Sequence, residues 1–138
     1  MFSILTHKYE CFTVQILSVL LFWRHAKLTR DQDMQSRLTG TWTLEMMDIL
    51  RCTNTVASDG SFSRQEATYL PRGTNIYQVT GLWRIKNGDL VETVTSNTAK
   101  IGVRLPHTDI HHIVRLDADE LTAFWYSTNE STWKKITK

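Results

Sequence analysis

Metal-binding side chains are most concentrated in the last third of the chain, where His107, Asp109, His111 and His112 follow one another closely. This is a donor set that zinc could use. Successive side chains of a strand point to opposite faces, so His111 and His112 cannot bind the same ion. His107 and His111 converge only if the chain bends between them. We therefore interpret the cluster as a surface feature at the start of a strand, and expect no metal site.

Carboxylates offer two further candidates. Asp117, Asp119 and Glu120 form an acidic turn that could hold a cation, but they lack the spacing of a calcium loop and are more typical of a solvated hairpin end. Glu45 and Glu92 could act as an acid–base pair, although solvent-facing strand positions explain both at least as well. The sequence gives no reason to name a catalytic residue.

Known catalytic and cofactor motifs are missing from the sequence. There is no Gly-x-Ser-x-Gly, no phosphate-binding loop and no dinucleotide fingerprint, so we expect a non-enzymatic protein without a cofactor. An enzyme built around His112 and a carboxylate is the weakest alternative. The net charge of +2 is spread along the chain without a basic run, which argues against a nucleic-acid partner. Cys11 and Cys52 lie far apart; a single disulfide is formally open, but we expect two free thiols.

Residues 1–33 differ in character from the rest. The apolar stretch 12–23 is followed by Arg24, Lys27 and Arg30. Twelve helical residues rise only about 18 Å, short of the roughly 30 Å hydrocarbon core of a bilayer. A secretory signal would need a positive segment before this stretch and a cleavage site after it, and neither is evident. Three interpretations stay open: an export signal or membrane-contacting anchor in the cell envelope or a secreted protein, a helix packed on a cytoplasmic domain, or non-native sequence upstream of a start at Met34.

Residues 34–138 show the period-two alternation of half-buried strands. We expect strands at 38–46, 62–70, 76–85, 90–96, 101–105, 110–116, 121–126 and 132–137, with the polar stretch 51–55 as a turn. Asp59-Gly60 and Asn87-Gly88 suit tight hairpins. About eight short strands with short connections predict an all-β domain, an antiparallel sandwich or barrel, preceded by an apolar N-terminal segment that is helical.

Three motifs carry a family resemblance. They are Leu38-x-Gly40-x-Trp42, then Asp59-Gly60-x-Phe62, then Gly81-x-Trp83-x-Ile85 with Asn87-Gly88 and Leu90. Their order and spacing over residues 38–96 resemble the lipocalins and the wider calycin group, and most closely the short bacterial lipocalin-like domains. The resemblance implies a closed up-and-down β-barrel that binds a small hydrophobic ligand. It also implies that Trp42, with Gly40, closes one barrel end beneath a basic side chain of the last strand, here Lys134 or Lys135.

The expected ligand-binding residues are those of the presumed inner faces: Tyr77, Val79, Trp83, His112, Val114 and Trp125. His112 stands on an otherwise apolar face, where it would orient the ligand. Trp42 is expected in the core, whereas Trp83 and Trp125 fit either core or pocket. Gly40 and Gly81 indicate close backbone approach. The alternative is a structural or protein-interaction domain with a filled barrel, which would use its outer surface or residues 12–23 to contact a partner or membrane.

Overall fold

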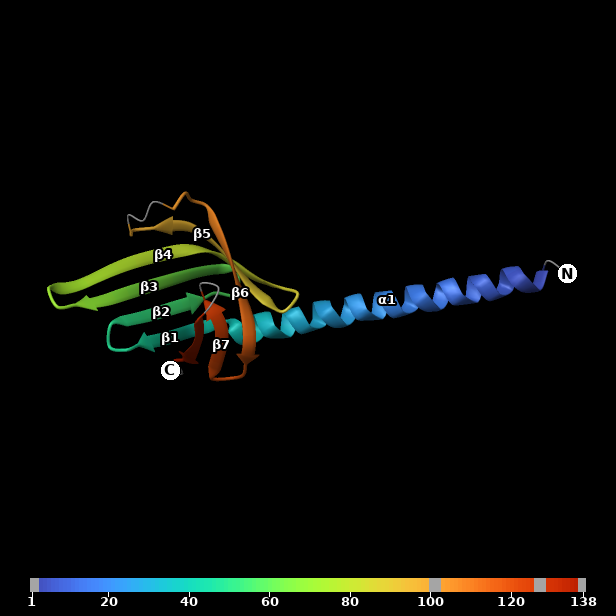
Figure 1. Cartoon of the computed structure of the whole chain (residues 1–138), viewed down its shortest axis with the longest axis horizontal. Coiled ribbons are helices and arrows are strands. Elements are labelled where there is room, and N and C mark those ends of the chain that lie inside the picture. The colour runs from blue at the N-terminus through green and yellow to red at the C-terminus, as the bar shows by residue number, and fades with distance from the viewer. Residues whose placement is uncertain (1–2, 100–102, 126–128, 137–138) are drawn as a thin grey trace.

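The chain folds into one long helix followed by a β-barrel (Figure 1). The computed structural model describes residues 3–99, 103–125 and 129–136, with side chains from residue 15 onward. The helix, α1 (Ser3–Leu38), extends away from the barrel, and its C-terminal part contacts β4 and β6. Within the described residues, no part of this helix is long and apolar enough to span a bilayer.

Eight strands form the barrel, and each pairs antiparallel with the next. They are β1 (Gly40–Met46), β2 (Leu50–Val56), β3 (Ser61–Leu70), β4 (Gly73–Lys86), β5 (Asp89–Asn97), β6 (His107–Leu116), β7 (Glu120–Trp125) and β8 (Asn129–Lys135). β8 returns to β1 and closes the barrel. A barrel of this size has an interior just wide enough to be packed or to hold one small molecule. The prediction of an all-β, up-and-down antiparallel barrel is confirmed.

The joint between the first and last strands is short. Among the described residues, β1 and β8 share two register pairs, Trp42 with Lys135 and Thr43 with Lys134, whereas β1 and β2 share seven. A backbone hydrogen bond from Ile136 N to Thr41 O, 2.8 Å long, adds to this joint.

Two strand predictions were wrong. The stretch 51–55, predicted as a turn, lies within β2, where Cys52, Asn54 and Val56 are buried. The polar Asn54 on the inner face hid the alternation. The strand predicted at 101–105 has no counterpart in its described part, because residues 103–105 lie outside any strand; residues 101–102 lie outside the described residues. The strand predicted at 110–116 corresponds to β6, which begins three residues earlier, at His107.

The predicted close approach at two glycines is confirmed. A Cβ on Gly81 would collide with the backbone carbonyl of Thr93 on β5, beside a register shift in the β4–β5 ladder. Gly40 has a φ of +137°, and a Cβ there would come within 2.6 Å of Cε of Lys135. Only glycine fits either position without displacing a neighbour.

The end of the barrel next to the helix is closed by a packed plug. Leu38 and Trp42 are each 1% exposed, and the indole Nε1 of Trp42 donates a 2.7 Å hydrogen bond to the Leu38 carbonyl. Lys135 lies over the Trp42 ring, as the resemblance implied for a basic side chain of the last strand. The core position expected for Trp42 is confirmed.

The helix is also fixed to the barrel by Asp31. Its carboxylate oxygens accept hydrogen bonds of 2.9 Å from the backbone N–H groups of Asn87 and Gly88, in the turn between β4 and β5. Met34, one turn further along, packs against the core. The helix residues that contact the barrel therefore range from 31 to 38, and they lie on both sides of the domain boundary expected between residues 33 and 34.

Candidate functional site

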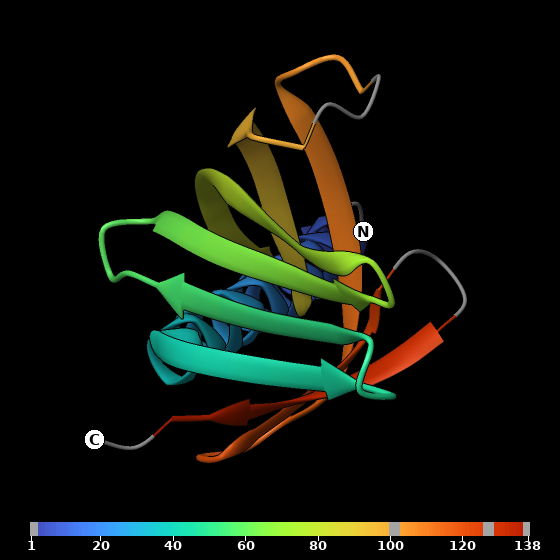
Figure 2. The same cartoon turned by 90° about the vertical axis from the view of Figure 1, so that its left-hand side faces the viewer.

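The end of the barrel away from the helix faces the viewer in Figure 2, and it is called the open end here because two cavities lie there. A cavity of about 90 Å³ lies there between β1, β2, β3, β7 and β8. Its lining is mostly apolar: Leu44, Met46, Leu50, Cys52, Arg64, Glu66, Trp125, Asn129, Ser131 and Trp133.

A second, larger cavity of about 320 Å³ lies between β3, β4, β5, β6 and the chain that leads into β6. It is lined by Arg64, Glu66, Val79, Val94, Asn97, Ala99, Val103, Leu105, His107 and Asp109. Arg64 and Glu66 line both cavities. These two side chains of β3 thus form part of the wall of both cavities.

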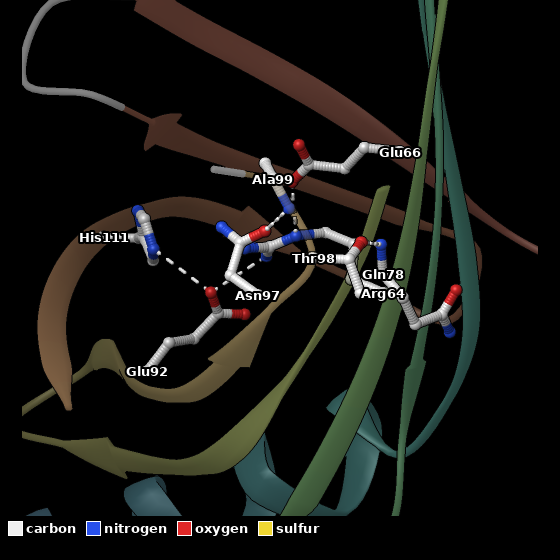
Figure 3. Close-up of polar contacts among 8 residues, drawn as sticks. All are labelled: Arg64, Glu66, Gln78, Glu92, Asn97, Thr98, Ala99 and His111. Carbon is white, nitrogen blue, oxygen red and sulfur yellow. Dashed lines mark hydrogen bonds and ion pairs between the residues drawn. The ribbon is translucent and has the colours of Figure 1, made fainter. Parts of the chain in front are cut away.

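Arg64 is held by two carboxylates (Figure 3). Its Nη1 donates a 2.9 Å hydrogen bond to Oε2 of Glu92 on β5, and its Nε donates one of 2.9 Å to Oε1 of Glu66. The Arg64 side chain is 7% exposed and that of Glu92 is 1% exposed. A buried ion pair persists only when both partners are well bonded, and this guanidinium meets that condition.

His111 of β6 completes this polar group. Its Nε2 lies 3.4 Å from Oε2 of Glu92, longer than a standard hydrogen bond, and its ring stacks on Trp125 with centroids 3.9 Å apart. Burial acts to raise the pKa of Glu92, but His111 and the positive charge of Arg64 outweigh it and hold the pKa below its ordinary value. Glu92 is therefore an anion at neutral pH.

Cys52 of β2 lines the smaller cavity as a buried free thiol. Burial, reinforced by the nearby charge of Glu66 and partly offset by Arg64, raises the pKa of this thiol to about 11. Such a thiol is a poor nucleophile at neutral pH. The side chain of Cys11 lies outside the described part of the chain.

Four of the six predicted ligand-binding residues point into the barrel or toward its axis, but the structure does not bring them all together. Val79 and Trp125 are buried and line the larger and smaller cavity respectively. Trp83 is buried, and its Nε1 donates a 3.0 Å hydrogen bond to the Ala57 carbonyl, so it packs in the core. Tyr77 is half-buried and lines neither cavity.

The orientation predicted for His112 and Val114 was wrong. Val114 is 50% exposed, and the His112 side chain is 68% exposed, with its Nδ1 2.9 Å from Oδ1 of Asp89 on the outer surface. The inward residue is His111. A one-residue error of phase on a strand exchanges its two faces, and Ile110, 68% exposed, supplied the misleading apolar pattern.

Sequence reasoning missed the charged interior. Glu92 was predicted to face solvent and is buried, while Arg64, Glu66 and Trp133 were not proposed for the site. The sequence of β3 contained a signal for a charged inner face. Phe62, Arg64 and Glu66 occupy every second position, so they lie on the same face of the strand. The rule that apolar residues mark the inner face concealed it.

The two surface clusters are explained by local contacts. Asp117 Oδ1 accepts hydrogen bonds from the backbone N–H groups of Glu120 and Asp119, and these bonds lower the pKa of Asp117. At the rim of the larger cavity, Nε2 of His107 lies 2.8 Å from Oδ1 of Asp109. Over the part of the chain that the structure describes, no three His, Cys, Asp or Glu side chains are close enough to hold a metal ion.

Comparisons with known proteins bear on the fold. No protein-family model and no curated protein matches the chain. Among solved structures, the chain is similar to a lipocalin-like protein from Bacteroides uniformis, with a TM-score of 0.50 and 16% sequence identity over 72% of this chain and 99% of that one. Together with the closed eight-stranded barrel, this match shows that residues of the barrel adopt a lipocalin-like fold.

Proposed function

We propose that this barrel binds a small, largely apolar molecule through its open end, without chemical change to that molecule. The observation that carries the proposal is the pair of cavities at this end, which meet at Arg64 and Glu66. Small-molecule sites are typically concave and mostly apolar, with a few fixed polar groups. The lipocalin-like fold supports the same function.

The walls of the two cavities suit an apolar ligand. Leu44 and Leu50 line the smaller cavity, and Val79, Val94 and Leu105 line the larger one. Arg64 supplies a polar group to the lining of both cavities, and its two ion pairs hold the guanidinium in place. A ligand therefore meets fixed walls and one fixed polar group, which limits the loss of side-chain freedom on binding.

Binding is favoured over catalysis by the state of the interior carboxylate. A general acid must carry a proton near the working pH, and a general base must reach the substrate. Glu92 is held as an anion by Arg64 and His111, and it is 1% exposed, which limits its access to substrate.

A dye titration tests the proposal. Nile red, a neutral hydrophobic dye, is titrated into the full 138-residue chain, and its fluorescence is followed together with tryptophan emission. Val79→Trp fills part of the larger cavity and is expected to weaken saturable binding about tenfold or more, whereas Val114→Trp on the outer surface leaves it unchanged. Thermal unfolding verifies that both variants are folded. Equal binding by the two variants would refute a site inside the barrel.

A second candidate function is favoured by the surface of α1. Seven of the eight side chains from residue 16 to residue 23 are apolar and substantially exposed: Ile16, Leu17, Val19, Leu20, Leu21, Phe22 and Trp23. An exposed apolar patch of this kind marks an interaction surface. Sedimentation velocity and co-sedimentation with anionic liposomes, each repeated with Leu20→Gln/Phe22→Gln, test this role. A wild-type chain that stays monomeric and unbound to liposomes would contradict it.

A further inference from the structure

Four of the chain's five tryptophans are buried in the barrel, and their indole N–H groups fall into two classes. Near the helix, Trp42 donates to the Leu38 carbonyl at 2.7 Å and Trp83 donates to the Ala57 carbonyl at 3.0 Å. At the open end, the Nε1 atoms of Trp125 and Trp133 are buried and meet no hydrogen-bond acceptor among the described residues.

The two unbonded indoles share one location. Trp125 on β7 and Trp133 on β8 both line the smaller cavity, and their ring centroids are 5.1 Å apart. They are 6% and 2% exposed, respectively. Buried tryptophans usually find an acceptor for the N–H group, and a buried donor without one is unfavourable. The two donors belong to side chains that line one small cavity, in a chain that satisfies the same group at Trp42 and Trp83, so a ligand in that cavity is a source of the missing acceptor once the rings adjust to admit it.

We propose that the N–H groups of Trp125 and Trp133 form the recognition point for an uncharged carbonyl oxygen of the ligand. The inference rests on the proposed ligand-binding function and names the chemistry of the ligand. A carbonyl oxygen has two lone pairs and can accept from two donors at once. The apolar remainder of the ligand packs on Leu44 and Leu50, which line the same cavity.

The surrounding charges favour a neutral acceptor over a carboxylate. Arg64 is the cation at this cavity, and it already pairs with both Glu66 and Glu92. A ligand carboxylate would therefore enter a region in which two negative charges already share one positive charge, and it would be repelled at short range. A ketone or an amide carries no such penalty.

The size of the cavity restricts the group further. At about 90 Å³, it is smaller than the roughly 150 Å³ cavity that accommodates benzene in a protein core. It therefore accommodates a small carbonyl-bearing end of a molecule, and the rest extends toward the open end of the barrel.

Three probes test the proposal: cyclopentanone, methylenecyclopentane, which matches its shape, and cyclopentanecarboxylate, which carries a negative charge on the same ring. Each is titrated into the ¹⁵N-labelled full-length chain, and the five indole N–H resonances are followed by NMR. Cyclopentanone is expected to shift the Trp125 and Trp133 resonances downfield and saturably, and to leave those of Trp42 and Trp83 in place. Its affinity is expected to exceed that of methylenecyclopentane, which has no acceptor, by about tenfold, because two hydrogen bonds are lost. Cyclopentanecarboxylate is expected to bind no more tightly than methylenecyclopentane.

Variants assign the effect to the two rings. Trp125→Phe and Trp133→Phe each remove one donor and keep an aromatic ring, so each is expected to reduce the preference for cyclopentanone about threefold or more. Trp23→Phe, on the exposed part of α1, is the matched control and leaves the preference unchanged. The wild-type titration remains decisive if a variant fails to fold.

The outcomes separate the two proposals. Equal affinity for cyclopentanone and methylenecyclopentane would overturn the role assigned to the two indoles, and so would NMR shifts confined to Trp42 and Trp83. The proposed ligand binding would still stand if Nile red binds inside the barrel. Tighter binding of the carboxylate than of the ketone would overturn the argument from charge. If neither the probes nor Nile red binds, the proposed function fails as well.

Discussion

The Nζ atom of Lys135 lies 5.2 Å from the centroid of the Trp42 ring and donates a 3.0 Å hydrogen bond to the carbonyl of Arg37. One ammonium group thus connects the last strand, the first strand and the C-terminal end of α1. A cation over an indole contributes about 0.5–1 kcal/mol at an exposed site. The interaction is also favoured by the negative end of the helix dipole, because Arg37 lies in the last turn of α1.

Trp42→Ala is expected to lower the free energy of unfolding by about 3–5 kcal/mol, because it removes a fully buried indole and leaves a cavity. Guanidinium denaturation followed by circular dichroism measures the loss. Lys135→Met, which keeps the apolar stem and removes the charge, is the control and should cost about 1 kcal/mol or less. A loss below about 1 kcal/mol for Trp42→Ala would show that the indole is not the plug of this barrel end.

Neighbouring histidines provide a direct comparison of the two faces of β6. His111→Ala removes a ring that stacks on Trp125 and contacts Glu92, and it is expected to destabilise the chain by about 2 kcal/mol. His112→Ala changes an exposed surface pair with Asp89 and should stay within about 0.5 kcal/mol of wild type. Thermal unfolding at pH 7 distinguishes the two. The opposite ranking would mean that the register of β6 is shifted by one residue.

Glu92→Gln is expected to destabilise the chain by about 3 kcal/mol at pH 7, since Arg64 loses a buried carboxylate. The folded-state pKa of Glu92 lies below its ordinary value of 4.5, so the stabilisation by the anion is complete above that pH and is lost as the pH falls through the folded-state value. The difference in free energy of unfolding between wild type and Glu92→Gln, measured by urea denaturation, should therefore become smaller below pH 4.5.

The control for Glu92→Gln is Glu45→Gln. Glu45 pairs with Arg51 on the surface, where both side chains are more than half exposed, so its loss should cost about 0.5 kcal/mol or less at every pH. A difference in free energy of unfolding between wild type and Glu92→Gln that stays constant from pH 7 to pH 3 would contradict the ion pair with Arg64.

Cys52 is expected to resist alkylation in the folded chain. With its pKa raised to about 11 by burial, roughly one thiol in a thousand is ionised at pH 8, and access is restricted as well. Iodoacetamide at pH 8, followed by peptide mapping with mass spectrometry, should modify Cys52 slowly in buffer and rapidly in 6 M guanidinium. Rapid modification in buffer would show that the smaller cavity opens widely to solvent.

Asp31→Ala is expected to speed hydrogen exchange at the backbone amides of Asn87 and Gly88 by about fivefold or more, because each amide loses a bond to a carboxylate. Asp33→Ala, whose carboxylate pairs with the exposed Arg37, is the matched control and should leave both amides unchanged. Equal exchange in the two variants would show that the end of the helix does not hold the β4–β5 turn.

The sequence predicted the architecture because its strongest signals are local. Alternating apolar residues and the Asn87-Gly88 turn depend on a few neighbouring residues, and Gly81 marks a close approach to the next strand that the structure confirms. The number of strands was right, although β2 was missed and a strand was predicted at 101–105, where the described residues form none. β2 was missed because Asn54 interrupts its apolar face, and that residue is buried only through the closure of the barrel.

The candidate site was much less accessible to sequence reasoning. Glu92 is inward because Arg64, 28 positions away in the sequence, is close enough in space to pair with it. A single sequence contains no indication of that pairing. At β6, both faces contain apolar residues, and the choice between His111 and His112 depends on which side of the strand the barrel encloses.

The short joint between β1 and β8 has a consequence for how the barrel forms. Every other pair of neighbouring strands is consecutive in the chain, whereas this pair brings together the two ends of the barrel sequence. The entropy lost in closing so long a loop is offset by few backbone bonds among the residues that the structure describes, so we expect this joint to form last on the folding pathway and to separate first on unfolding. The sheet would then open at this joint as a twisted sheet while the seven pairings between consecutive strands are still intact.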